Sequence, residues 1–229
     1  MAASSLLEPG LVQVAGVIDH DEATLLLECR VRYLGFPLRL PVNREDLTEA
    51  ATAAIIRSLR LPARAVLITY LVEADEIRQF CHTLGARIVQ LHGDVPVSEI
   101  GRLRAIDPSL TILKSLVVGL HPMPVLERTV AELAPLVDAF ITDTFAPETG
   151  ASGATGRTHD WALSRRLVER SPRPVILAGG LTPGNVRQAI REVRPAGVDV
   201  HTGVEDASGR KSRAKVMAFV AEARAGFEH

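Results

Sequence analysis

Eight short runs of apolar and β-branched residues recur along this chain, and an amphipathic stretch follows each of them. This alternation predicts parallel strands joined by crossover helices. The predicted strands cover residues 11–17, 31–36, 65–71, 87–92, 111–117, 138–144, 174–178 and 197–201. The predicted helices cover residues 21–29, 44–59, 73–84, 97–106, 123–136, 160–169, 183–193 and 212–225.

Eight strand–helix units in 229 residues predict a single (β/α)₈ barrel, the TIM barrel, near its minimum size and spanning residues 1–229. The alternative is a doubly wound open sheet, which usually has fewer strands and a glycine-rich first turn. The first turn here, residues 15–19, reads AGVID and contains no GxGxxG motif. The pattern therefore favours the barrel.

Three residues are expected to mark the ends of helices. Gly85 is placed to close the third helix in the left-handed conformation. Thr158 is expected to cap the sixth helix, and Pro183 to occupy the first turn of the seventh.

The overall charge is balanced, with 26 basic and 27 acidic side chains and a formal net charge of -1. This balance does not favour nucleic acid or an anionic membrane as a partner. The sequence has no signal-peptide pattern and no apolar run long enough to span a bilayer, so we expect a cytoplasmic protein. Cys29 and Cys81 lie on separate predicted helices, with no second cysteine close in sequence to either of them. We therefore expect both to be reduced thiols in the core. The expected partner is a phosphorylated small molecule, and the chain is expected to be a monomer or homodimer.

The last two predicted strands end in glycine, at residues 178–180 (AGG) and 201–203 (HTG). Glycine lets main-chain amides approach an anion closely, and a following helix N-terminus favours negative charge. In a barrel of this kind, phosphate commonly binds after strands seven and eight. The sequence therefore predicts a phosphate clamp formed by Gly179, Gly180, Thr202 and Gly203.

Titratable side chains occur at several other predicted strand ends. Asp143 lies at the end of the sixth predicted strand beside a long polar loop, where it is a candidate general acid or, alternatively, a cap for loop amides. Asp199 faces the predicted interior and needs a partner or a substrate. Lys114 is similarly placed and could pair with a carboxylate inside the barrel, in a structural or a catalytic role.

His92 and Arg39 complete the set of candidate substrate contacts. His92 ends the fourth strand and could serve as an acid, a base or a hydrogen-bond donor. Arg39 follows the second strand and is either an anion contact or a solvated surface arginine. The seven histidines form no HxH or HExxH motif, so no metal site is predicted.

Five segments carry a resemblance to a known family. They are residues 89–93 (VQLHG), 143–144 (DT), 153–161 (GATGRTHDW), 178–183 (AGGLTP) and 198–205 (VDVHTGVE). In order and spacing they resemble phosphoribosylanthranilate isomerase of tryptophan biosynthesis, over nearly the whole chain. The resemblance implies a TIM barrel that converts an aminoaldose phosphate into an aminoketose phosphate, an Amadori rearrangement, without cofactor or metal.

The resemblance also implies two proton-transfer groups. The family's general acid, an Asp after strand six, corresponds to Asp143. Its general base is a Cys in a Lys-Ile-Cys-Gly pattern at the end of strand one, but residues 13–16 here read Gln-Val-Ala-Gly, so Ala15 stands in place of the base. His201 and Thr202 replace the family's paired serines, and the loop after strand two is shortened, with Arg39 as its one arginine.

Four residues are candidates for a substitute base: Asp19, His20, His92 and His201. The alternative role for His201, which the sequence favours, is a hydrogen bond to the phosphate. The alternative is a catalytically silent barrel that binds a phosphorylated ligand or a protein partner. A third reading is an aldolase or synthase that uses Lys114 as a Schiff-base nucleophile.

Overall fold

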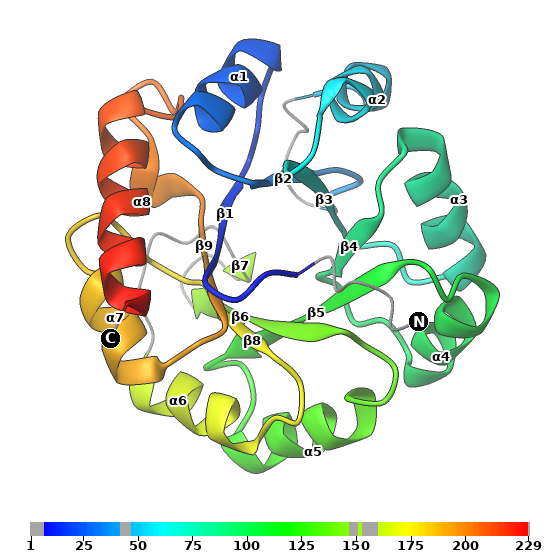
Figure 1. Ribbon diagram of the computed structural model, residues 1–229. Helices are drawn as coiled ribbons and strands as arrows, with labels where there is room; N and C mark the ends of the chain where they lie inside the picture. The colour runs from blue at the N-terminus through cyan, green and yellow to red at the C-terminus, as the bar shows by residue number, and fades with distance from the viewer. Residues whose placement is uncertain (1–6, 42–46, 147–150, 153–159, 229) are drawn as a thin grey trace.

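The computed structural model describes residues 7–41, 47–146, 151–152 and 160–228. It is a closed barrel of parallel strands inside a ring of helices (Figure 1). The strands are β1 (Leu11–Ala15), β2 (Tyr33–Pro37), β3 (Arg64–Thr69), β4 (Ile88–Leu91), β5 (Thr111–Val118), β6 (Ala139–Ala146), β7 (Ala151–Ser152), β8 (Val175–Leu177) and β9 (Gly197–Val200). The helices are α1 (His20–Glu28), α2 (Glu49–Ser58), α3 (Ala74–Leu84), α4 (Val97–Ile106), α5 (Met123–Leu133), α6 (Trp161–Arg170), α7 (Val186–Val193) and α8 (Arg213–Phe227).

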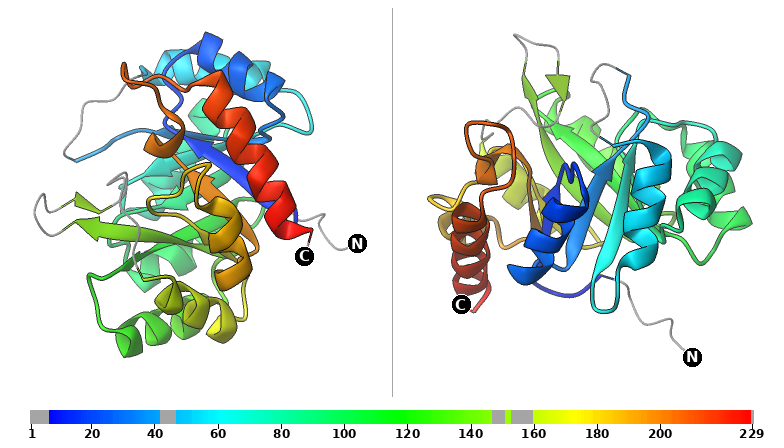
Figure 2. Two further views of the ribbon diagram at one scale, coloured as in Figure 1. Left: turned by 90° about the vertical axis from the view of Figure 1, so that its left-hand side faces the viewer. Right: turned by 90° about the horizontal axis from the view of Figure 1, so that it is seen from above.

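Eight of the strands pair in parallel in the order β5-β4-β3-β2-β1-β9-β8-β6, and a further pairing of β5 with β6 closes the circle. β7 is an addition to this barrel. It pairs antiparallel with the end of β6, so that part of the predicted long loop after the sixth strand is a hairpin. Figure 2 shows this hairpin projecting at the end of the barrel opposite to the start of β1 and the end of α8. The predicted TIM barrel is confirmed.

Alternate residues of each strand face the barrel interior or the helices. Leu11, Ala15, Ile88 and Leu113 belong to the inner apolar cluster. Val14, Val89, Ile112 and Leu116 lie at the alternate positions of the same strands and belong to the outer cluster, which packs against the helices. This alternation also decides which polar side chains reach the interior.

Local signals explain where several helices begin and end. Asp19, Thr48 and Ser212 each cap a helix by accepting a hydrogen bond from a first-turn amide. Gly85 ends α3 with φ of 83°, as predicted. No helix among the residues that the structure describes is long and apolar enough to cross a membrane.

Two of the predicted helix starts are wrong, and a third falls outside the described residues. Asn185 is the N-cap of α7, whose first residue is Val186, and Pro183 lies in the preceding turn. The Asn185 side chain stabilises this turn by accepting from the Thr182 amide and donating to the Gly180 carbonyl. α2 begins at Glu49 rather than at residue 44. Thr158 lies outside the described residues, and Asp160 caps α6.

Candidate active site

The two glycine-ended turns of the predicted phosphate clamp lie against each other. β8 and β9 are neighbouring strands, and η1 (Thr202–Val204), a short 3₁₀ helix, follows β9. A Cβ atom on Gly203 would lie 1.9 Å from the Leu181 carbonyl oxygen, a contact that only glycine permits. Gly179 and Gly180 have φ of 102° and 63°, in the left-handed region that favours glycine. The backbones of the turns after β8 and β9 therefore lie in close contact where the clamp is predicted.

Asp143 and His92 meet at the same end of the barrel, from β6 and from the end of β4. Asp143 Oδ2 lies 3.6 Å from His92 Nδ1, and both side chains are largely buried. Burial raises the pKa of the Asp143 carboxyl, while the His92 charge and the Thr144 amide oppose the rise. A carboxyl whose protonated form is favoured can donate a proton.

A chain of side-chain hydrogen bonds crosses the interior beneath this pair. Ser115 Oγ lies 3.1 Å from His92 Nδ1 and accepts from Gln90 Nε2 at 3.2 Å. Gln90 Oε1 accepts from Gln13 Nε2 at 3.3 Å. The chain therefore links His92 on one side of the barrel to β1 on the other.

Asp199 lies beside Gln13, its register partner on the adjacent strand. Its Oδ1 atom is shielded from solvent and has no hydrogen-bond partner in the described part of the chain. Burial, with the charge of Asp143 as the second cause, raises the pKa of Asp199 to about 7, against hydrogen bonding from Gln13. The charge of Asp143 thus acts on Asp199 in the barrel interior.

Lys114 does not face the barrel interior, and the prediction that it does is wrong. It alternates with inward-facing Leu113 and shares the outward direction of Ile112 and Leu116. Its ammonium donates to the carbonyl oxygens of Gly93 and Ser115, each at 3.0 Å, where a carboxylate partner was expected. Burial lowers its pKa to about 8.

Arg39 is engaged at the edge of the site. Its Nε donates to Glu49 Oε1 at 2.9 Å, and its guanidinium carbon lies 4.0 Å from the centre of the Phe80 ring. Both residues of the Arg39–Glu49 pair are substantially exposed. Its role as an anion contact stays a prediction.

Gly16 directly follows Ala15, the last residue of β1, and the His201 ring lies against the Gly16 position. A Cβ atom on Gly16, whose φ is 76°, would lie 2.0 Å from His201 Nε2. Nε2 also lies 3.4 Å from Glu205 Oε1. Burial and the Lys211 charge lower the pKa of His201 to about 4, and Glu205 opposes this shift.

Lys211 and Glu205 form a buried ion pair behind His201. The Lys211 ammonium donates to Glu205 Oε1 at 2.6 Å, and the lysine side chain has no exposed surface. The Lys211 amide donates to Glu22 Oε1, while the Ile18 amide donates to Glu22 Oε2. The buried Glu22 carboxylate therefore joins the loop after β1 to the loop before α8.

The remaining candidates for a substitute base lie at the edge of the loop after β1. Asp19 caps α1 and accepts from Arg210 at 2.6 Å, and these contacts lower its pKa despite some burial. His20 is exposed and lies 3.5 Å from the hydroxyl of Thr24 on its own helix. The structure therefore brings together Asp143, His92 and Asp199, and it places His201 beside Gly16 and Glu205. Asp19 and His20 have none of these contacts among those described.

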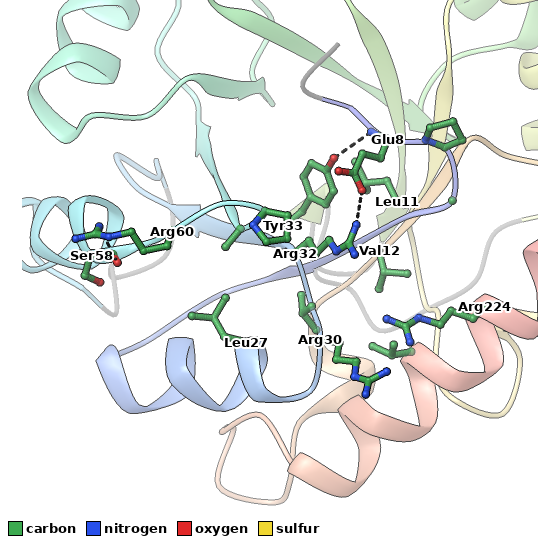
Figure 3. Close-up of a pocket in the computed structure, with 16 residues that line it drawn as sticks. Glu8, Leu11, Val12, Leu27, Arg30, Arg32, Tyr33, Ser58, Arg60 and Arg224 are labelled. Carbon is green, nitrogen blue, oxygen red and sulfur yellow. Dashed lines mark hydrogen bonds and ion pairs between the residues drawn. The ribbon is translucent and has the colours of Figure 1, made fainter. Parts of the chain in front are cut away.

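A separate hollow of about 910 Å³ lies at the opposite end of the barrel, between the starts of β1 and β2 and the end of α8. Figure 3 shows its arginine side chains, at positions 30, 32, 60 and 224, and the pairing of Arg32 with Glu8 at 2.7 Å. None of the predicted site residues lines it. Since the chemistry of a (β/α)₈ barrel belongs to the other end, this hollow is no part of the candidate site.

Sequence reasoning assigned no role to Gln13, Gln90, Ser115 or the Lys211–Glu205 pair. A signal existed for the two glutamines, because each interrupts an apolar strand at an inward position. The sequence carries no comparable signal for Lys211, since this residue lies in a loop and is buried only by tertiary contacts. Among the described residues, no group of three or more His, Cys, Asp or Glu side chains could hold a metal ion.

Known proteins resemble this chain over almost its full length. The family model for N-(5'-phosphoribosyl)anthranilate isomerase matches residues 12–222. A protein of that name from Methanosarcina mazei is 38% identical over 221 residues, 94% of this chain and 95% of its own. One from Haloferax volcanii is 38% identical over 223 residues, covering 93% and 92%. The crystal structure of the Thermotoga maritima enzyme superposes with a TM-score of 0.78 at 28% identity, over 93% of this chain and 98% of that one.

Proposed function

Because the chain belongs to the N-(5'-phosphoribosyl)anthranilate isomerase family, we propose that it catalyses the Amadori-type rearrangement of phosphoribosylanthranilate in tryptophan biosynthesis. The observation that carries this proposal is the position of Asp143. Its buried carboxyl, with a raised pKa, lies at the end of β6 beside His92. An acid with these properties is what ring opening of an aminoaldose requires.

In the first step, Asp143 donates its proton to the ring oxygen of the sugar. The bond between that oxygen and C1 breaks, and the nitrogen lone pair forms the C=N bond of an open-chain Schiff base. His92 contacts the sugar and stabilises the Asp143 carboxylate after the proton has left, because its electrostatic contribution lowers the pKa of that carboxyl. Asp199 is the second polar contact, supported by its unpartnered interior oxygen.

The substrate phosphate binds at the turns after β8 and β9. Gly179, Gly180, Thr202 and Gly203 provide main-chain amides there, and the close packing of Gly203 on Leu181 supports a clamp with little room for side chains. Arg39 is the proposed contact for an anionic group at the other end of the substrate. Its exposed pair with Glu49 is worth only about 0–1 kcal/mol, so exchange for a substrate carboxylate costs little.

The direct test is turnover of phosphoribosylanthranilate by the purified protein, with the aminoketose phosphate product measured by chromatography. Growth of a tryptophan-requiring strain that lacks this isomerase tests the same function in cells. We expect activity in both, and its loss in the Asp143→Asn variant. Absence of turnover, together with absence of a thermal shift with ribose phosphates, would overturn the proposal.

Ala15 is the observation that favours a second candidate, a silent barrel that retains the pocket for binding. Measurable affinity for the aminoketose phosphate with no turnover across aminosugar phosphates would support it. Turnover that depends on Asp143 would exclude it. The third reading, a Schiff base on Lys114, loses support because that side chain points away from the barrel interior.

A further inference from the structure

The residue at the end of β1 has no group that can accept a proton. Ala15 contributes only a methyl group to the inner apolar cluster. β1 pairs in parallel with β9, with Val14 opposite Val200. Ala15 and His201 are therefore the next residues after this register pair, and the alternation along each strand favours an inward direction for both.

The conformation of Gly16 brings His201 closer still. His201 Nε2 is the ring atom nearest to the position that a Cβ atom of Gly16 would occupy, at 2.0 Å from it. Any other residue at position 16 would displace the ring. The imidazole therefore occupies the space beside Gly16, the residue that follows Ala15, and the His201 side chain is 29% exposed, so that it remains accessible.

We infer that the His201 imidazole is the proton acceptor of the isomerisation, in the place that a side-chain base at position 15 would otherwise take. This inference rests on the proposed function. It assigns the proton transfer to the residue that follows β9, whereas the position of a base on β1 carries only a methyl group.

The step that this assignment implies is balanced without an external oxidant or reductant. His201 Nε2 takes the proton from C2 of the open-chain Schiff base. The electron pair of the C2–H bond becomes the C1=C2 bond, and the C=N pair returns to nitrogen. Loss of the proton from the C2 hydroxyl and protonation at C1 then give the ketone.

The surroundings of His201 suit a base that is neutral at rest. Burial and the Lys211 charge hold its pKa at about 4, so the ring nitrogen is free of an added proton at neutral pH. When Nε2 takes up a proton, the Glu205 carboxylate at 3.4 Å stabilises the resulting cation. A phosphate dianion at the adjacent Thr202–Gly203 turn raises the basicity of the ring further in the complex.

The other candidates are placed less well. Asp19 is held by Arg210, His20 is exposed on α1, and His92 lies beside Asp143. Asp199 is the strongest competitor, since its pKa is about 7 and its Oδ1 is unpartnered. It lies one inward position before His201, opposite Gln13 rather than Ala15.

Replacing Ala15 by Cys distinguishes a role of His201 as the base from a role of Asp199 as the base. We expect His201→Asn to lower kcat by about 10² to 10⁴-fold with little change in KM, as for loss of a general base. Release of a deuterium label from sugar C2 should slow equally. The double variant Ala15→Cys/His201→Asn should recover most of the lost kcat. His201→Gln is a second variant, and thermal melts confirm that each protein is folded.

The matched comparison is Asp199→Asn with and without Ala15→Cys. Rescue of Asp199→Asn but not of His201→Asn would overturn the inference in favour of Asp199. A rise in KM without a fall in kcat for His201→Asn would also overturn it, because it would show a phosphate contact. A wild type that is inactive while Ala15→Cys is active would refute the role of His201 and leave the family's reaction intact. Inactivity of both would refute the proposed function itself.

Discussion

His92 Nδ1 and Asp143 Oδ2 lie 3.6 Å apart, at the ends of strands that are not neighbours in the barrel. β5 lies between β4 and β6, and its Ser115 hydroxyl also contacts the imidazole. The acid of the proposed reaction is therefore positioned by three consecutive strands of the barrel.

Replacing Asp143 by Asn should lower kcat by about 10² to 10⁴-fold, because the amide cannot donate the proton that opens the sugar ring. Steady-state kinetics with phosphoribosylanthranilate measure this change. Asp75→Asn, an exposed carboxylate on α3 paired with Arg102, is the matched control and should leave kcat unchanged. An Asp143→Asn variant with more than a tenth of the wild-type kcat would contradict the assignment.

Replacing His92 by Asn should extend activity to higher pH. Burial raises the pKa of Asp143, and the charge of His92 lowers it. Removal of His92 should therefore raise the pKa of Asp143 further. Since Asp143 acts in its protonated form, the alkaline limb of the kcat profile should then move upward. Ser115→Ala retains the imidazole and is the control. A downward shift of the limb in His92→Asn would refute this account.

Replacing Asp199 by Asn should stabilise the protein at pH 8 but not at pH 4. The folded-state pKa of Asp199, about 7, exceeds the ordinary aspartate pKa of 3.8. The folded state therefore binds more protons between these values, and the contribution of Asp199 to stability falls as pH rises. We expect a gain of roughly 2 to 4 kcal/mol in the free energy of unfolding at pH 8. Urea denaturation of both proteins at pH 4 and pH 8 measures this gain. An equal difference in the free energy of unfolding at the two pH values would contradict the raised pKa of Asp199.

Gly203→Ala should weaken phosphate binding and destabilise the fold by about 1 to 3 kcal/mol, since its Cβ meets the Leu181 carbonyl oxygen at 1.9 Å. The two turns must move apart to accommodate it. Gly184→Ala is the matched control, because its Cβ would meet only the Thr182 hydroxyl, at 3.7 Å. Calorimetry with ribose 5-phosphate and thermal melts compare the two variants. Equal affinity in both would place the phosphate elsewhere.

Lys211→Met should destabilise the protein by about 3 to 5 kcal/mol, as expected when one partner of a buried ion pair is removed. The loss leaves the Glu205 carboxylate without its cation beside His201. Addition of Glu205→Gln should recover part of the stability, because no unpaired buried charge remains. Denaturant titrations of the single and double variants provide the check, and additive losses would argue against a coupled pair.

The barrel was predictable from sequence because apolar strand segments and amphipathic helix segments alternate regularly along the chain. Each of the eight barrel strands corresponds to an apolar run in the sequence. The inward direction of Asp143 and Asp199 follows from alternation along their strands. The direction of Lys114 was misjudged although the same alternation applies, since Leu113 beside it faces inward. The Asn185 cap was missed because Pro183 imitates a helix start.

Other features of the site depend on contacts between distant segments. The position of His201 beside Gly16 requires the pairing of the first and last strands, and the Lys211–Glu205 pair requires the loop before α8 to fold back. Neither contact has a local pattern in the sequence. The list of candidate groups was therefore obtainable from sequence, but their arrangement needed the structure.

The contact of Glu22 with the amides of Ile18 and Lys211 has a consequence for how the protein is made. A ribosome delivers α1 early and residue 211 near the end of synthesis. Until then the Glu22 carboxylate lacks one of the donors that hold the loop after β1, which carries Gly16 to Asp19. The mouth of the barrel can therefore take its final form only when the last loop has emerged, so that a truncated chain lacks a finished substrate pocket.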